Sequence, residues 1–537
     1  MKTSAQLQQY KKCIILFMIG VISSAIAYAL YAVDPTRLIF EYKLTMTPTS
    51  TVYLTWKKPP IGVYIKVYIF NITNPEAFLA GQEKLKVEEI GPYVYQEVLE
   101  NTKVVWHDNG TISYTPKRTV YFVPEKSRSN PVDDIVNVPN VPMLGVSSAV
   151  HDQGFLVNYP LAQMANLLDS KPILTMPVYE YLWGYEDPLV RLAAGIVPNF
   201  INFRKFGLLD RMYDEGENVV NMNIQKSKNM LEENGRYLSI ETYNGSPGLP
   251  HWGYTEPETN ETIPGNTICN QIRGATEGTL FPTDIDRDVV FRVFRKAFCR
   301  VLPIVFKSES YEQGLRVFEY KFADDFLDPP EMNADNECYC RKMETCLKRG
   351  LSDLTPCYYN IPAAVSLPHF LDADPSLIEG VEGLNPDPEK HRTRIFIQPD
   401  VGAPLNVNSR IQTNLVMQHT VYNPRIKAFN GLVVPLFWSD LEISKDGNEL
   451  ISLMRLLLVI APVVQTSVVY ILAIVGITTF VLSLVGTLRL LNQQTEEYAE
   501  ERRDSVDLRM PLGMGQYTAI HILPAIKKIT SKTDLFG

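Results

Sequence analysis

Two long apolar segments lie near the ends of the chain, and their lengths predict membrane-spanning helices. Residues 13–33 carry no charge and follow Lys11 and Lys12. About 20 apolar residues cross a bilayer, so this segment fits one helix. A cleaved signal peptide is the alternative, because Ala25-Ile26-Ala27 resembles a cleavage site. Signal-peptide cores are shorter, about 7–15 residues, so we favour a retained anchor.

The second apolar segment, residues 456–488, is too long for a single perpendicular span. Pro462 and Gln465 interrupt it early. We therefore place the second span at 467–488 and predict an apolar helix over 451–460 that leads into it.

Charge predicts the orientation of the two spans. The tail of residues 1–12 is basic and without acid, and Arg489 stands at the start of the tail of residues 489–537. Positively charged flanks stay in the cytoplasm, so we predict that both tails are cytoplasmic. Residues 34–455 then form one large extracellular or luminal domain.

Composition narrows the classes of partner. With 45% hydrophobic and 10% aromatic residues, the chain is too apolar to be disordered. Its 51 basic and 60 acidic residues give a net charge of −9. Nucleic acids are bound through basic patches, so we expect no nucleic-acid partner.

The region between the spans alternates in the manner of β-strands. Runs rich in β-branched and aromatic residues, bounded by Pro and Gly, predict a large antiparallel sheet or barrel. These runs are residues 63–70, 93–95, 119–123, 394–397 and 411–416. In contrast, Leu161, Met164, Ala165 and Leu168 follow helical spacing, so we expect a helical insert at 150–215. The fold class predicted is a membrane protein of α+β type.

Cysteines and sequons support a compartment outside the cytoplasm. Four Asn-x-Ser/Thr sequons all fall between the spans, at Asn71, Asn109, Asn244 and Asn260. Six of the seven cysteines also lie there, and an even number in an oxidising compartment predicts three disulfides with 15 pairings open. Zinc is disfavoured, because the spacing does not match a zinc knuckle and no paired histidine lies nearby. The remaining Cys13, at the edge of the first span, is an acylation site or an apolar filler.

Signatures of catalysis are absent from the sequence. It contains no G-x-S-x-G, no H-E-x-x-H, no phosphate-binding glycine loop and no dinucleotide fingerprint. Carboxylates are plentiful, but no pair stands out for acid–base chemistry. We therefore expect no enzyme, no metal and no cofactor.

Several motifs resemble those of the class B scavenger receptor family. They are residues 68–75 (YIFNITNP), 89–95 (EIGPYVY), 182–188 (LWGYEDP), 367–371 (LPHFL), 383–386 (GLNP) and 389–393 (EKHRT). The similarity runs from about residue 12 to 490. It implies an antiparallel β-barrel core, a helical apex bundle at 150–215, and an apolar tunnel from the apex toward the bilayer. It also implies the disulfides Cys269–Cys338, Cys299–Cys357 and Cys340–Cys346.

The resemblance also implies ligand-binding residues. In the family, basic residues on the apex attract anionic ligands, and Lys171, Arg204 and Lys205 are the candidates in this chain. The alternative is that all three are ordinary surface charges. The family-like segment before Trp183 has one lysine here, where the fatty-acid-binding member has two.

These features predict a receptor that binds lipids, lipoproteins or lipid-bearing particles at its apex. It would pass hydrophobic cargo of the fatty acid, sterol or carotenoid class through the tunnel to the plasma membrane. One alternative is an endosomal or lysosomal trafficking receptor for a luminal protein. Another is an adhesion or phagocytic receptor.

The C-terminal tail carries a candidate sorting signal. Tyr517-Thr518-Ala519-Ile520 fits the pattern Tyr-x-x-bulky apolar, which a clathrin adaptor binds as an added strand with two anchors, Tyr517 and Ile520. It predicts cycling through endosomes or lysosomes. Residues 517–529 forming a short membrane-surface helix is the alternative. Asp507–Gly513 resembles an acidic dileucine signal but lacks the second bulky aliphatic residue.

Overall fold

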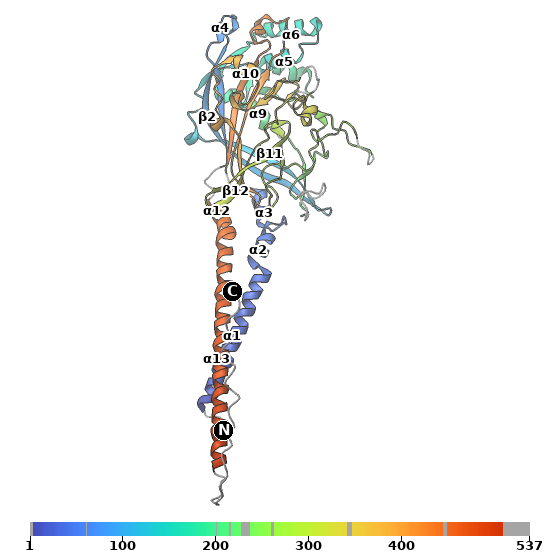
Figure 1. Ribbon diagram of the computed structural model, residues 1–537. Coiled ribbons are helices and arrows are strands. Elements are labelled where there is room, and N and C mark those ends of the chain that lie inside the picture. The colour runs from blue at the N-terminus through green and yellow to red at the C-terminus, as the bar shows by residue number, and fades with distance from the viewer. Residues whose placement is uncertain are drawn as a thin grey trace, which may run out of the picture. The chain divides into compact units, whose positions relative to one another are not determined.

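The computed structural model describes residues 4–60, 62–199, 201–213, 216–226, 237–258, 263–340, 346–443 and 448–507. The chain divides into two compact units (Figure 1). We call Met1–Pro35 with Val463–Gly537 the membrane unit, and Thr36–Pro462 the sheet domain.

The membrane unit contains two long helices, α1 (Ser4–Val33) and most of α13 (Ala461–Asp507). Both belong to segments long and apolar enough to cross a membrane, as the sequence predicts. They pack through small residues: a Cβ atom on Gly20 would lie 3.1 Å from the carbonyl oxygen of Gly476. Nearby, the Ser483 hydroxyl donates a hydrogen bond to the Cys13 carbonyl at 2.8 Å. Glycine allows such close approach, which is how helices associate in lipid.

The helix that leads into α13 is present, but Pro462 does not interrupt it. Helix α12 (Asn448–Arg455) continues through a π-helical turn, η9 (Leu456–Ile460), into α13. Proline lacks an N–H and clashes with the preceding turn of a regular helix. A π-turn changes the hydrogen-bond register directly before Pro462, so the helix continues past it.

One sheet of 14 strands dominates the sheet domain. Its order is β10-β11-β12-β16-β17-β18-β1-β2-β3-β8-β9, with β13 and β14 joined to β17 and β15 joined to β2. All pairs are antiparallel except β15 with β2. The central strands are β1 (Val63–Ile72), β2 (Leu85–His107), β3 (Thr111–Phe122), β16 (Arg394–Gln398), β17 (Ala403–Val416) and β18 (Val433–Ile443). The others are β8 (Val220–Asn223), β9 (Ile240–Tyr243), β10 (Phe291–Arg295), β11 (Arg300–Glu312), β12 (Leu315–Phe322), β13 (Ser352–Asp353), β14 (Ala363–Ser366) and β15 (Val381–Glu382).

The predicted strands are confirmed, and their composition explains their place. All five predicted runs overlap β1, β2, β3, β16 and β17. β-Branched and aromatic side chains fit a pleated surface that is buried on one face. In β1, for example, Ile65, Val67 and Ile69 alternate with less buried neighbours.

The sheet does not close into a barrel by strand pairing. Among the described residues, the end strands β9 and β10 do not pair with each other. Residues 274–276 lie between them instead. On one side, the Ile240 N–H donates to the Ala275 carbonyl at 2.7 Å. On the other, the Thr276 N–H donates to the Arg292 carbonyl, also at 2.7 Å.

Helices occur where the insert is predicted. They are α6 (Phe155–Leu167), α7 (Val178–Trp183), α8 (Pro188–Ile196) and α9 (Leu208–Tyr213), preceded by α5 (Val141–Ala149). Two small strand pairs, β4 (Ile135–Pro139) with β5 (Ile173–Pro177) and β6 (Tyr185–Glu186) with β7 (Lys205–Phe206), separate them. In α6 the buried residues are Asn158, Ala162 and Ala165. Of the apolar positions used to predict this helix, only Ala165 is buried.

Shorter helices complete the sheet domain. They are α2 (Pro35–Leu44), α3 (Thr51–Lys57), α4 (Pro75–Leu79), α10 (Pro375–Glu379) and α11 (Pro388–His391). Figure 1 shows α5 and α6 at one end of this domain, and α3 and α12 at the opposite end.

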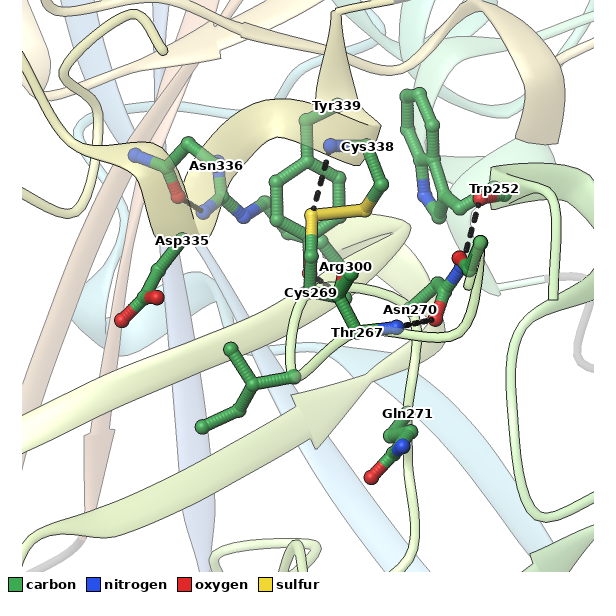
Figure 2. Close-up of a disulfide and its surroundings, with 12 residues drawn as sticks. Trp252, Thr267, Cys269, Asn270, Gln271, Arg300, Asp335, Asn336, Cys338 and Tyr339 are labelled. Carbon is green, nitrogen blue, oxygen red and sulfur yellow. Dashed lines mark hydrogen bonds between the residues drawn. A yellow bond between two sulfur atoms is a disulfide. The ribbon is translucent and has the colours of Figure 1, made fainter. Parts of the chain in front are cut away.

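Three disulfides join Cys269 to Cys338, Cys299 to Cys357 and Cys340 to Cys346. These are the pairs that the family resemblance implies. Figure 2 shows Cys269–Cys338 with the Tyr339 ring and Arg300 beside it. The buried Tyr339 hydroxyl donates a hydrogen bond to the Cys269 carbonyl at 2.5 Å. This bond links the two segments that the disulfide also joins.

Candidate functional site

A row of three cavities runs through the interior of the sheet domain. The first, of about 130 Å³, is lined by inward-facing residues of adjacent strands. Ile65 of β1 lies opposite Leu441 of β18, and Ile395 of β16 lies opposite Val407 of β17. Directly opposite residues of an antiparallel pair share a face of the sheet. The alternation along each strand therefore builds one continuous apolar wall.

The second cavity, of about 250 Å³, adjoins the first. The two share four lining residues, Gly278, Arg295, Val407 and Leu441. The second cavity also touches α3 through Trp56 and reaches Pro59 and Pro60. It therefore extends toward the end of the domain that carries α3 and α12 (Figure 1).

The third cavity, of about 40 Å³, adjoins the first on the other side. They share Met212 of α9. Its wall comes from the insert, with Val141 and Phe206, and from the strands, with Leu415 and Phe437. The row thus runs from the insert to the α3 end of the domain.

A charged cluster lies where the first and second cavities meet. Glu97 lines the second cavity and Arg118 the first, and their side chains are only 3% and 5% exposed. Arg118 Nε lies 3.3 Å from Glu97 Oε1. Arg295 lines both cavities, with its Nη2 3.8 Å from the same oxygen. We call Glu97, Arg118 and Arg295 the cavity cluster.

Strand register brings the cavity cluster together. Glu97 of β2 pairs with Val120 of β3, so Arg118 is its diagonal neighbour. Diagonal neighbours share a face and lie within reach of long side chains. Tyr213, at the end of α9, lines the first cavity beside them. Burial raises the pKa of the Tyr213 hydroxyl well above 10, and the charge of Glu97 adds to the shift.

This arrangement can hold an amphipathic molecule. Apolar walls favour hydrocarbon by roughly 0.8 kcal/mol for each CH₂ removed from water. Ligand sites of this kind combine mostly apolar lining with a few polar groups that fix orientation. The cavity cluster supplies those polar groups between two apolar chambers.

Comparison with known proteins identifies the family. The model of the CD36 family matches residues 13–487, nearly the whole chain. The chain belongs to the CD36 family. It is 28% identical over 448 residues to bovine Scavenger receptor class B member 1, covering 82% of each chain. It is 30% identical over 448 residues to human Lysosome membrane protein 2, covering 81% of this chain and 86% of that protein. The resemblance drawn from the sequence motifs is thus confirmed.

In this CD36 family chain, the predicted apex residues are exposed but not gathered into one contact. Lys171 follows α6, Arg204 precedes β7, and Lys205 lies in β7 opposite Glu186. None of the three side chains makes an ion pair with a described residue. They are therefore solvated cations on the insert, outside the lining of the three cavities.

The predicted sequons differ in their surroundings. Asn109 is exposed in the turn between β2 and β3, and its Oδ1 accepts from the Thr111 hydroxyl at 2.8 Å. Asn244 is exposed in a turn as well. Asn71 lies half-buried in β1, where its Oδ1 accepts from the Asn137 N–H at 2.8 Å. Asn260 lies outside the described residues.

Two histidines from the family motifs meet in a second polar cluster. His369 and His391 stack with ring centroids 4.5 Å apart and planes 13° apart. The Asn385 N–H donates to His369 Nδ1 at 3.0 Å, so Nε2 carries the proton and donates to Glu89 at 2.6 Å. Burial alone would raise the pKa of Glu89, but the hydrogen bonds from His369 and Trp438 lower it.

The ligand atoms of Glu89, His369 and His391 lie within 4.8 Å of one another. Their geometry does not favour a metal. Lone pairs of nearly parallel stacked rings point side by side rather than toward one point, and the two Nδ1 atoms accept backbone hydrogen bonds. The other close group, His251 with Cys299 and Cys357, has its sulfurs in a disulfide. Among the described residues, these are the two groups dense enough to hold a metal ion.

Sequence reasoning missed the cavity cluster, although one signal was available. In β2, Tyr95, Glu97 and Leu99 alternate and are all buried. A glutamate at a position where alternation requires an apolar residue marks a buried charge that needs a partner. The sorting signal with Tyr517 and Ile520 lies outside the described residues.

Proposed function

We propose that this chain is a lipid receptor of the cell membrane that transfers hydrophobic cargo through the row of cavities. A lipid delivered by a particle would enter from the insert, pass the cavity cluster and leave at the α3 end of the sheet domain. The proposal needs no covalent chemistry, metal or cofactor.

The observation that carries the proposal is the sharing of lining residues. Met212 belongs to the third and first cavities, and Leu441 to the first and second. Separate voids would be packing defects, whereas voids that share walls in series form an interrupted passage. Small side-chain movements at the shared residues are enough to join them. The named role of the bovine relative as a scavenger receptor supports the same reading.

The remaining parts of the proposal follow the family resemblance. The insert would act as an apex bundle on a barrel-like wall that residues 274–276 complete. Its exposed cations Lys171, Arg204 and Lys205 would attract anionic lipids or lipoprotein surfaces. Both tails would be cytoplasmic, and a clathrin adaptor would bind at Tyr517 and carry the protein from the plasma membrane through endosomes.

Blocking the shared walls tests the passage. Met212→Trp and Leu441→Trp fill the two junctions with a larger ring. In cells given lipoprotein that carries a fluorescent sterol ester, we expect both variants to bind particles normally and to lose transfer to the membrane. Tyr311→Trp is the matched control, because Tyr311 is 73% exposed. Normal transfer by both junction variants, present at the cell surface, would rule out the passage.

Salt dependence tests the exposed cations. Replacing Lys171, Arg204 and Lys205 together by glutamine removes charge and retains length. Exposed charges are screened over about 10 Å at 0.1 M salt. We expect weaker binding of anionic vesicles at low ionic strength and little change at high ionic strength. If the variant and the wild type bind the vesicles equally well at both ionic strengths, the three residues are ordinary surface charges.

A second function has a specific observation in its favour. Helix α6 exposes large apolar side chains, with Leu156 84% and Leu167 86% exposed. Such a face fits docking of a protein, and one relative is named Lysosome membrane protein 2. If the chain carries a luminal protein, Leu156→Asp with Leu167→Asp should abolish sorting of that protein and leave lipid transfer unchanged.

A further inference from the structure

The cavity cluster contains an acceptor that the protein leaves without a hydrogen bond. Oε2 of Glu97 accepts no hydrogen bond of good geometry from the described residues, although the side chain is 3% exposed and the Tyr213 hydroxyl interacts with the same carboxylate. Its other oxygen, Oε1, forms ion pairs with Arg118 Nε at 3.3 Å and Arg295 Nη2 at 3.8 Å. A buried acceptor without a donor is costly, about 1–3 kcal/mol, unless a bound molecule completes it. Glu97 lines the second cavity, so such a molecule would lie there.

The unpaired Glu97 carboxylate oxygen and the Arg295 guanidinium lie close together in the cavity cluster. Arg295 Nη2 is 3.8 Å from Glu97 Oε1, too far for a direct hydrogen bond. Arginine offers five N–H donors and no acceptor, whereas an ionised glutamate only accepts. A polar group that fits both must accept from Arg295 and donate to Glu97.

We infer that the cavity cluster binds the hydroxyl group of a lipid alcohol, with Glu97 Oε2 accepting its proton and Arg295 donating to its oxygen. This inference rests on the proposed function, because it requires lipid in the cavities. It names the head group that the passage recognises.

Competing head groups satisfy this site less well. A carboxylate is attracted by Arg118 and Arg295, but it offers no proton to Glu97, so it leaves Oε2 without a donor and sets two like charges side by side. An ester or ether accepts from Arg295 but leaves Oε2 unpaired. Among lipid head groups, a hydroxyl group is the smallest that does both. The apolar walls on both sides, including Val407 and Leu441, accommodate its hydrocarbon part.

Three matched probes test the inference on the purified full chain in nanodiscs. They are radiolabelled hexadecanol, hexadecyl methyl ether and hexadecanoate, which share one hydrocarbon chain. A hydrogen bond to a charged group predicts that hexadecanol binds about tenfold more tightly than the ether. Hexadecanoate should also bind more weakly than hexadecanol.

Variants assign the preference to Glu97. Glu97→Leu should bring the ratio of alcohol to ether affinity close to one. Because this change leaves Arg118 buried without its carboxylate, Glu97→Leu with Arg118→Leu is the second variant, and the same ratio is expected. Ser439→Ala is the control: Ser439 is a polar residue of the first cavity outside the cavity cluster, so its loss should leave the ratio unchanged.

The outcomes separate this inference from the proposed function. Equal affinity of the wild-type chain for alcohol and ether would overturn the inference and leave a lipid passage intact. Tighter binding of hexadecanoate would overturn it in favour of an anion site. Binding of none of the three would overturn both the inference and the passage.

Discussion

Two arginines at paired positions of the β10–β11 hairpin occupy opposite kinds of interior. Arg295 lines two open cavities, with Glu97 3.8 Å away. Arg300, its partner across the hairpin, is 2% exposed and packed solidly. It donates to Ser352 and Asn336, and its guanidinium lies 3.8 Å from the centre of the Tyr339 ring.

The difference separates two uses of an interior arginine, since Arg300 is buried and the Arg295 side chain is 22% exposed. Around Arg300, rings and disulfides fill the space, and burial lowers the pKa of its guanidinium (Figure 2). Its hydrogen bonds go to neutral groups, so it serves packing. Arg295 keeps room for a further molecule beside it. We call the packed surroundings of Arg300 the closed region and the cavities beside Arg295 the open region. The closed region stabilises the fold, and the open region leaves space for binding.

Removing disulfides from the closed region should give the largest effect. Cys299–Cys357 closes a separation of 58 residues and Cys340–Cys346 one of six. Loop-closure entropy predicts losses of about 4 and about 2 kcal/mol for the paired alanine variants. Chemical unfolding of the purified chains measures both. Equal losses would mean that loop length does not govern their contribution, and non-reducing peptide mapping checks the pairing.

Replacing the two arginines tests the comparison directly. Arg300→Met leaves Asn336 and Ser352 without their donor, so we expect a loss of about 3 kcal/mol. Arg295→Met removes only a long ion pair beside a cavity, and we expect a loss below about 1 kcal/mol. Thermal unfolding compares the two under one set of conditions. A larger loss from Arg295 would reverse the assignment of closed and open regions.

His391 gives a third test of how burial acts on a cation. A histidine can lose its charge when it is buried, whereas an arginine stays protonated. Burial first, and His369 second, lower the pKa of His391 to about 4. The unfolded chain, with a histidine pKa near 6.5, therefore binds more protons between pH 6.5 and 4. Stability should fall as the pH drops through this window, by about 2 kcal/mol after solvent screening.

His391→Asn isolates that contribution, since its Oδ1 can still accept from the Asp387 N–H that His391 Nδ1 now receives. Unfolding of wild type and variant is measured at pH 7, 5.5 and 4.5. The variant should lose less stability on acidification. If the unfolding free energies of wild type and variant fall equally with pH, groups other than His391 cause the acid sensitivity.

Local chemistry made the framework predictable from the sequence. Charge-free length predicted both apolar helices, and β-branched alternation predicted β1 and β17, because both depend on neighbours in the chain. In α6 the same logic gave the helix but not its buried face. There Leu167 is exposed and Ala162 is buried, because contacts with distant segments decide which side is covered.

The cavities could not be predicted in this way. Val407 and Leu441 line a void, whereas Val434 is wholly packed, and nothing in the sequence distinguishes them. A void depends on what the opposite strands fail to fill. The cavity cluster needed the register of β2 and β3, since Glu97 and Arg118 are far apart in the chain.

The short link at residues 274–276 gives the wall of the sheet domain a seam. β17 and β18 pair from Asn408 to Val416 with one irregularity, between Thr413 and Asn414, whereas Thr276 joins β10 through two backbone hydrogen bonds, to Arg292 and from Phe294. The wall should therefore open along this line before its long ladders separate. Amide hydrogen exchange would reveal the seam as faster exchange at Thr276 and Phe294 than along β18.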